Sequence, residues 1–240
     1  MKRAVLALIL ALAFICLCAA AAAEPGKLYL VFIGGDGDVA GTPNDVFKAA
    51  LAAHEDLQDK AETFLVRSVK SDYTNATAIR QGKLAEECLS PDGINVVAAY
   101  SHGGQSLYFM NLDNVTDVFL LDGCVSIGGK CTGKDYESKG RVWSQWIVDT
   151  ARKGINVHHY APIGKHNEAT ASKNAMSKLE KMAEEDETLV ALGDGQYRVL
   201  DEAGNAVALI DTGLWEGEHK NICRVTVDRI AEWIYQILDR

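Results

Sequence analysis

Basic residues are scarce in this sequence relative to acidic ones. The chain has 24 lysines and arginines against 33 aspartates and glutamates, which gives a formal net charge of −9 at pH 7. Nucleic acids and anionic membrane surfaces attract basic proteins. The excess of acidic residues therefore argues against both classes of partner.

Long apolar runs are absent beyond the first 23 residues, so no later stretch could span a bilayer. Internal repeats, linkers and low-complexity segments are absent as well. The chain starts with Lys2-Arg3, continues with an apolar run from Ala4 to about Ala20, and has small residues up to Ala23. This pattern is typical of a secretory signal peptide. The sequence predicts an exported protein, secreted or periplasmic, with a signal peptide over 1–23 and a single domain over 24–240.

Cysteines are few, and two of the six lie in the predicted signal peptide. In an oxidising compartment, an even number of remaining cysteines suggests disulfides. Cys124 and Cys131 are close enough in sequence to close a small loop, but the pairing is open. The four cysteines of the mature part are Cys88, Cys124, Cys131 and Cys223.

Strand and helix patterns alternate along the mature part. The alternation predicts a three-layer α/β/α sandwich with a mostly parallel central sheet. Ligands of such sheets bind beyond the carboxyl ends of the strands. The expected strands cover 28–33, 63–69, 94–100, 118–121 and 155–160, the expected helices cover 76–89, 142–153, 169–185 and 222–238, a further helix starts near residue 44, and a hairpin covers 197–210.

Side-chain orientations follow from these patterns. On the helix 76–89, we expect Ile79, Leu84 and Cys88 to face inward. His158 and His159 are adjacent on a strand, so we expect one to pack inward and the other to face outward.

The turn after the third expected strand carries the strongest functional signal. Residues 99–103 read Ala-Tyr-Ser-His-Gly, a small-x-Ser-x-Gly pattern between a buried strand and a helix. A sharp corner of this kind needs small residues around the central one. It lifts the hydroxyl of Ser101 clear of the sheet and points the following backbone N–H groups at one spot.

This turn resembles the nucleophile elbow of the α/β-hydrolase family, and the resemblance extends over most of the mature chain because other parts come in the same order. Ala99 stands where the family most often has glycine. The resemblance implies an α/β-hydrolase-like fold in which Ser101 is the nucleophile. It also implies that backbone N–H groups of His102 and of the loop at Gly35 and Asp36 form the oxyanion hole.

The resemblance also implies a catalytic histidine between the last strand and the final helix, where His219 lies. For the acid, most members use a residue after the strand that here ends at Tyr160, but this chain has Asn167 where aspartate is usual. Some lipases carry the acid one strand earlier, which here is Asp122. Asp122 is the favoured acid and Glu168 the second choice.

The favoured function is that of a secreted serine hydrolase that cleaves an ester or similar acyl bond, without metal or cofactor, on a small-molecule or acyl substrate. One alternative is a resemblance to caspase-like cysteine peptidases, in which His102 would be the base and Cys124 the nucleophile. Another is a non-catalytic secreted binding module on a hydrolase-like frame.

Overall fold

The computed structural model describes residues 27–35, 43–67, 74–164 and 167–239. The predicted signal peptide lies outside these residues. In the described part of the chain, no helix combines the length and the apolar character that crossing a membrane requires.

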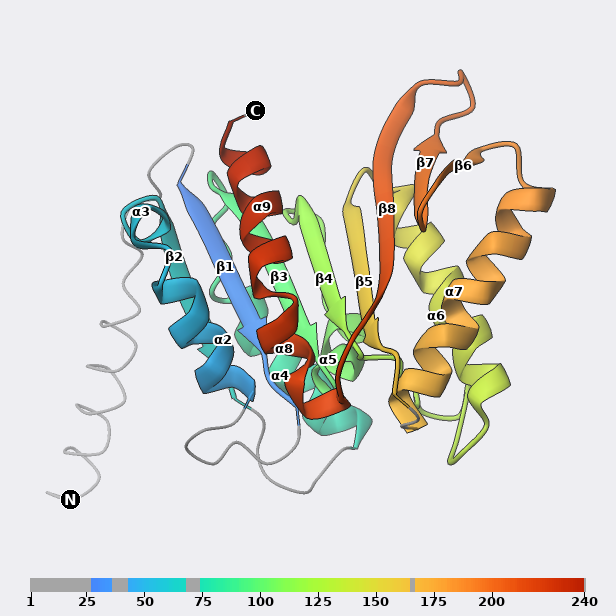
Figure 1. Cartoon of the computed structure of the whole chain (residues 1–240), viewed down its shortest axis with the longest axis horizontal. Coiled ribbons are helices and arrows are strands. Elements are labelled where there is room, and N and C mark those ends of the chain that lie inside the picture. Colours follow the sequence, from blue (N-terminus) through green and yellow to red (C-terminus); the bar gives the residue numbers. More distant parts are fainter. Residues whose placement is uncertain (1–26, 36–42, 68–73, 165–166, 240) are drawn as a thin grey trace, which may run out of the picture.

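One eight-stranded sheet forms the centre of the molecule, in the order β2-β1-β3-β4-β5-β8-β7-β6 (Figure 1). The strands from β2 to β8 in this order run parallel, and β7 and β6 continue the sheet as an antiparallel extension. The strand bounds are β1 Leu28–Ile33, β2 Ala61–Val66, β3 Ile94–Tyr100, β4 Asp117–Leu121, β5 Asn156–Pro162, β6 Leu189–Gly193, β7 Gln196–Leu200 and β8 Ala206–Trp215.

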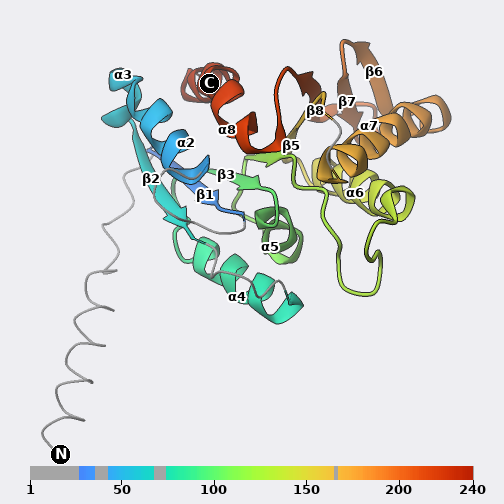
Figure 2. The ribbon, with the colours of Figure 1, turned by 60° about the horizontal axis from the view of Figure 1, so that its bottom comes forward.

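Helices cover both faces of the sheet. One apolar layer packs against α4, α5, α6 and α7, and the other packs against α2, α3, α8 and α9 (Figure 2). The predicted three-layer, mostly parallel, α/β-hydrolase-like fold is therefore confirmed. The helix bounds are α2 Pro43–Ala52, α3 Glu55–Gln58, α4 Asn75–Glu86, α5 Gly103–Phe109, α6 Tyr136–Ala151, α7 Asn167–Glu185, the 3₁₀ turn η1 His219–Asn221, α8 Ile222–Val225 and α9 Val227–Leu238.

The central strands are apolar on both sides because both sides are covered. In β3, for example, Val97 and Ala99 face one layer, whereas Val96 and Ala98 face the other. All four are completely buried. A continuous apolar run, rather than an alternating one, is what a parallel strand covered on both faces requires.

The expected inward orientation is wrong for Ile79 and Leu84 of α4, whereas Cys88, just after this helix, packs against the core as expected. Ile79 and Leu84 are 40% and 47% exposed, and the helix instead buries small and polar residues. The cause is a close approach to α5: a Cβ added to Gly82 would lie 3.0 Å from the carbonyl oxygen of Ser106. The Ser106 hydroxyl also donates a hydrogen bond to Gln81, at 2.7 Å. A small, hydrogen-bonded face therefore replaces the aliphatic face that the sequence pattern suggested.

Three further expectations need correction. His158 and His159 are both completely buried, because β5 lies between β4 and β8 with a helix layer on each face. The expected final helix is divided into α8 and α9 at Thr226, whose hydroxyl donates to the carbonyl oxygen of Ile222 at 2.7 Å. Strand β6 was not expected, since four of its five residues are exposed and show no alternation.

The predicted disulfides are also wrong. In the described part of the chain, no disulfide joins any two of Cys88, Cys124, Cys131 and Cys223. Cys223 packs in one apolar layer, whereas Cys124 and Cys131 pack in the other. The sheet therefore separates Cys223 from the other two. The Cys131 sulfur instead accepts a hydrogen bond from the backbone N–H of Ile127, at 3.2 Å.

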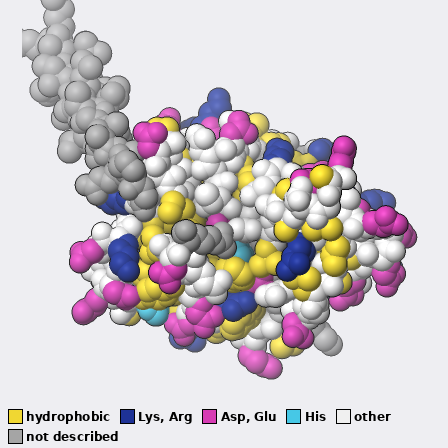
Figure 3. Space-filling view, turned by 90° about the horizontal axis from the view of Figure 1, so that it is seen from above, with side chains coloured by type: hydrophobic (Ala, Val, Ile, Leu, Met, Phe, Trp, Pro, Cys, Tyr) yellow, Lys and Arg dark blue, Asp and Glu magenta, His cyan; other side chains and the backbone are white. Residues whose placement is uncertain are grey.

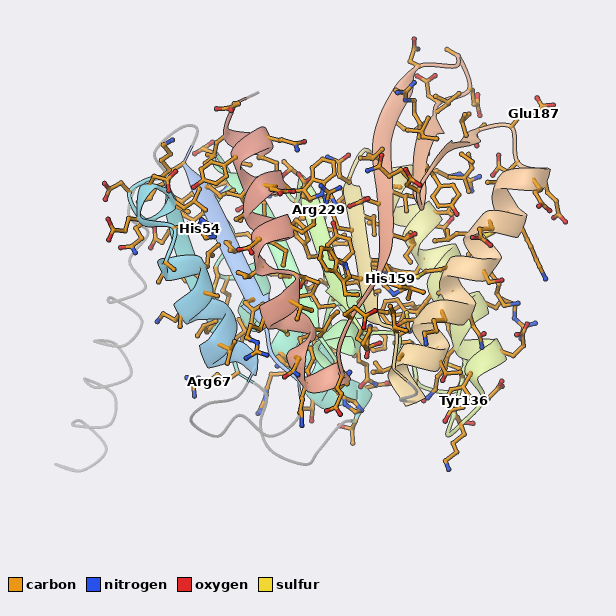
Figure 4. All side chains as sticks on the ribbon, viewed as in Figure 1. His54, Arg67, Tyr136, His159, Glu187 and Arg229 are labelled. Atoms are coloured by element: carbon orange, nitrogen blue, oxygen red, sulfur yellow. The ribbon has the colours of Figure 1, made fainter. Side chains whose placement is uncertain are left out.

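A buried polar network fixes the position of β8, the strand that leads to His219. The carboxylate of Asp211 on β8 accepts hydrogen bonds from the Tyr160 hydroxyl at 2.5 Å, Trp233 Nε1 at 3.2 Å and Gln196 Nε2 at 3.1 Å. The Arg229 guanidinium of α9, labelled in Figure 4, lies 3.5 Å from the same carboxylate. The network therefore ties β5, β7, β8 and α9 together.

The amino-terminal ends of the parallel strands lie at the top of Figure 1, and their carboxyl ends lie at the bottom. On the amino-terminal end of the molecule, acidic, basic and hydrophobic side chains are mixed, and many acidic side chains lie around the rim (Figure 3). This distribution accords with the acidic composition of the chain.

Replacing Asp211 by asparagine should weaken the fold and change its response to acid. Although burial opposes ionisation, the hydrogen bonds and the neighbouring His158 lower the pKa of Asp211 to about 2. A carboxyl with an unfolded-state pKa of about 3.9 then stabilises the fold above pH 4 by about 2 kcal/mol, and this contribution is lost as the pH falls towards 2. We expect Asp211→Asn to lose this stability at pH 7 and to show a flatter pH dependence between pH 4 and 2, as measured by urea unfolding.

The exposed Asp113→Asn is the matched control, and its free energy of unfolding should change by less than about 0.5 kcal/mol. If the free energy of unfolding changed with pH in the same way for the wild type and Asp211→Asn, the proposed contribution of the Asp211 carboxylate to stability would be contradicted.

Candidate functional site

The site lies at the carboxyl ends of three parallel strands. Ser101 follows β3, Asp122 follows β4, and His219 follows β8 in the turn η1. Tyr100 and Leu121 are register partners at the ends of β3 and β4, so Ser101 and Asp122 leave the sheet at the same level.

Ser101 occupies a strained corner between β3 and α5. Its φ is +52°, in the left-handed region that non-glycine residues seldom adopt, and its backbone N–H donates to the carbonyl oxygen of Leu121 at 3.1 Å. Asp122 shows the same feature at the end of β4, with φ +46°. Strained backbone at the ends of two adjacent strands is characteristic of functional corners.

Glycines make this corner possible. A Cβ added to Gly103 would lie 2.4 Å from the carbonyl oxygen of Ile33, and one added to Gly104 would lie 2.2 Å from that of Gly123. A side chain at either position would clash with the backbone of a neighbouring strand end. Helix α5 can therefore begin directly against the ends of β1 and β4 only because both residues lack a side chain.

His219 lies within hydrogen-bond distance of the other two side chains that the sequence indicated, Ser101 and Asp122. His219 Nε2 is 3.0 Å from Ser101 Oγ, and His219 Nδ1 is 2.6 Å from Asp122 Oδ2. The Tyr100 ring stacks on the imidazole, with 4.9 Å between ring centroids. Asp122 is completely buried, whereas the His219 side chain is 16% exposed and Ser101 is 4% exposed.

This arrangement can perform acid–base-assisted nucleophilic chemistry. An imidazole between a hydroxyl and a carboxylate can take the hydroxyl proton on one nitrogen while the carboxylate holds the other N–H. The described residues contain no group of three or more histidine, cysteine or acidic side chains that could hold a metal ion.

The expected oxyanion-hole loop is described only in part. Gly35 packs against the nucleophile corner, and a Cβ added to it would lie 2.7 Å from the Ser101 Cβ. Asp36 lies outside the described residues, as does the side chain of Glu168, the second choice for the acid. His102, whose N–H is the other expected donor, directly precedes α5.

Cys124 and His102, the pair of the alternative interpretation, are not joined by a described hydrogen bond. The Cys124 sulfur instead lies 3.4 Å from Nε2 of His159, whose position on β5 is labelled in Figure 4. Burial raises the pKa of the Cys124 thiol well above its usual value and lowers the pKa of His159 to about 3. Both groups are therefore neutral at pH 7, which does not suit a thiolate–imidazolium nucleophile.

One polar contact at this site could not be predicted from the sequence. The hydroxyl of Ser172, on α7, donates a hydrogen bond to Asp122 Oδ1 at 2.9 Å. Ser172 lies among the apolar and charged residues of an amphipathic helix, and no local pattern distinguishes it from an ordinary helix serine.

No protein-family model matches the chain, and no curated protein matches it. A solved structure described as "a His-tagged Serine Hydrolase Involved in the Carbazole Degradation (CarC enzyme)" aligns with 90% of this chain and 93% of its own, at 13% sequence identity and a TM-score of 0.43. At this level the alignment carries no argument about function.

Replacing Gly104 by alanine should destabilise the corner. The added methyl group would lie 2.2 Å from a backbone carbonyl oxygen, so β4 or α5 must move, and overpacking of this kind costs about 1–3 kcal/mol or more. We expect a lower midpoint of thermal unfolding and a loss of Ser101 reactivity towards a fluorophosphonate.

Gly129→Ala is the control, because nothing lies within 4 Å of the Cβ at that position and only its positive φ opposes the change. Gly129→Ala should retain Ser101 reactivity. Full reactivity and stability in Gly104→Ala would show that the two strand ends are not packed as described.

Proposed function

We propose that this protein is a serine hydrolase that cleaves an ester or similar acyl bond through Ser101, His219 and Asp122. The observation that supports it most is the continuous pair of hydrogen bonds from Ser101 Oγ through His219 to Asp122, at 3.0 and 2.6 Å. This hydrogen-bonded order of hydroxyl, imidazole and carboxylate matches the roles of nucleophile, general base and orienting acid.

In the proposed mechanism, Ser101 Oγ attacks the carbonyl carbon of the substrate while His219 Nε2 takes its proton. The tetrahedral intermediate collapses when His219 returns the proton to the leaving alcohol, which gives an acyl-Ser101 ester. Water then attacks this ester with the same assistance and releases the carboxylic acid and free Ser101.

Asp122 would hold the Nδ1–H of His219 and stabilise the imidazolium that forms in each half-reaction. Backbone N–H groups of His102 and of the loop at Gly35 and Asp36 would donate hydrogen bonds to the developing oxyanion. The mechanism requires no metal or cofactor. Secretion or periplasmic export, with removal of residues 1–23, is part of the proposal and rests on the amino-terminal sequence pattern.

Ser101→Ala should abolish turnover of short-chain p-nitrophenyl esters by about 10³-fold or more and should eliminate fluorophosphonate labelling, because no other hydroxyl would replace the nucleophile. Ester release and mass-spectrometric labelling measure the two effects. Retention of both by Ser101→Ala would refute the proposed function.

Cys124→Ser is the matched variant for the cysteine-peptidase alternative, because serine keeps the size and hydrogen-bonding capacity of the side chain. We expect ester turnover to change by no more than several-fold and iodoacetamide to leave activity intact, since the thiol is buried and its pKa is raised. A loss of 10³-fold in Cys124→Ser, with Ser101→Ala active, would favour the alternative instead.

A further inference from the structure

The carboxylate of Asp122 is held on both of its oxygens. Oδ2 faces His219 Nδ1 at 2.6 Å, and Oδ1 accepts the hydrogen bond of the Ser172 hydroxyl at 2.9 Å. Both Asp122 and Ser172 are completely buried. The Ser172 hydroxyl also has the Cys124 thiol as a neighbouring hydrogen-bond partner, but its one hydrogen is donated to Asp122 Oδ1, the oxygen that His219 does not use.

This second contact has a geometric consequence. A carboxylate with one held oxygen can still rotate about its Cβ–Cγ bond, which changes the direction in which the other oxygen points, because this torsion has a broad energy profile. A donor on Oδ1 fixes that rotation and therefore the direction of the bond to His219. Because the site is buried, the Ser172 hydrogen bond also replaces the hydrogen bond that water would otherwise donate to Oδ1.

Helix α7, which carries Ser172, is itself firmly placed. Ala171 and Ala175, on the same helix, are completely buried in the core. Their small side chains let α7 approach the sheet closely. Its Lys173 side chain donates a hydrogen bond, at 3.1 Å, to the carbonyl oxygen of Gly164, two residues after the end of β5. A Cβ added to Gly140 of α6 would lie 2.6 Å from that of Asn174, so the two helices are in close contact next to Ser172.

We propose that Ser172 is a positioning residue: its hydroxyl orients the Asp122 carboxylate towards His219 and so maintains the reactivity of Ser101. This role rests on the proposed function. Helix α7 follows β5, so the segment that follows this strand supplies a hydrogen-bond donor to an acid carried by the adjacent strand β4.

The first test measures the second-order rate of fluorophosphonate labelling. In this reaction Ser101 Oγ bonds to phosphorus, fluoride leaves, and the serine proton passes to His219. We expect Ser172→Ala to label about 10-fold more slowly than the wild type, because a misdirected carboxylate no longer orients the imidazole. The matched control is Ser144→Ala on α6, a 2% exposed helix serine whose hydroxyl donates to its own helix at the Arg141 carbonyl oxygen, and it should label at the wild-type rate.

A double-mutant cycle separates positioning from a general structural effect. In an Asp122→Asn background, Ser172→Ala should change the labelling rate by less than about 2-fold, since the group through which Ser172 acts is already altered. An equal loss in both backgrounds, or a rate for Ser172→Ala like that of Ser144→Ala, would overturn the role of Ser172.

Proton NMR gives a second readout that does not depend on residual activity. The hydrogen-bonded proton on His219 Nδ1, assigned by its absence in His219→Gln, should shift in Ser172→Ala and stay in place in Ser144→Ala. An unchanged resonance would overturn the proposal. If Ser101→Ala still labels, the proposed function fails and the role of Ser172 fails with it. If Ser101→Ala is inert but Ser172→Ala labels normally, only the role of Ser172 is wrong.

Discussion

The site depends on the contact between the start of α5 and the ends of β1 and β4. Gly103 and Gly104 lie so close to the carbonyl oxygens of Ile33 and Gly123 that neither could carry a Cβ without movement of the backbone. This contact forces the chain to turn within one residue after β3, and it places Ser101 in the left-handed region. Because Gly123 directly follows Asp122, the same contact also fixes the second corner relative to the first. The distance between the proposed nucleophile and acid is thus set by backbone packing before any side chain interacts.

The fold class and the edge of the sheet that carries the candidate site could be predicted, because both follow from rules about parallel sheets. Apart from Asn95, the run 94–100 is apolar without alternation, which is typical of a strand covered on both faces, and the carboxyl end of such a strand lies at the ligand-binding edge. That rule locates Ser101 and Asp122 at this edge, whereas the roles predicted for them and for His219 came from the resemblance to α/β hydrolases. The fold class could be predicted because alternation of strands and helices restricts the sheet to few arrangements.

The features that the sequence did not predict depend on which surfaces meet. Gln81 and Gly82 form the buried face of α4 because α5 approaches closely there, and an amphipathic pattern centred on Ile79 and Leu84 cannot reveal that approach. Cysteine count and predicted compartment suggested disulfides, but Cys223 lies across the sheet from Cys124 and Cys131, and the Cys131 sulfur accepts a backbone hydrogen bond from Ile127 instead of pairing with Cys124. The contact of Ser172 could not be predicted for the same reason. Its hydroxyl donates to a residue 50 positions away, and the residues next to Ser172 in the sequence do not indicate this hydrogen bond.

The position of the proposed acid, Asp122, also has a geometric explanation. β4 is the direct neighbour of β3, so an acid at the end of β4 starts about 4.8 Å from the strand of the nucleophile, whereas an acid after β5 starts one strand further away. β5 is in turn the neighbour of β8, from which His219 comes, so a residue after β5 could reach the histidine more directly. An acid on β4 must reach His219 across the end of β5, and Asp122 is anchored there, since its N–H donates to the carbonyl oxygen of Tyr160 at 2.7 Å. A carboxylate in this position gains from a donor on the far side, and helix α7 after β5 is the element placed to provide it.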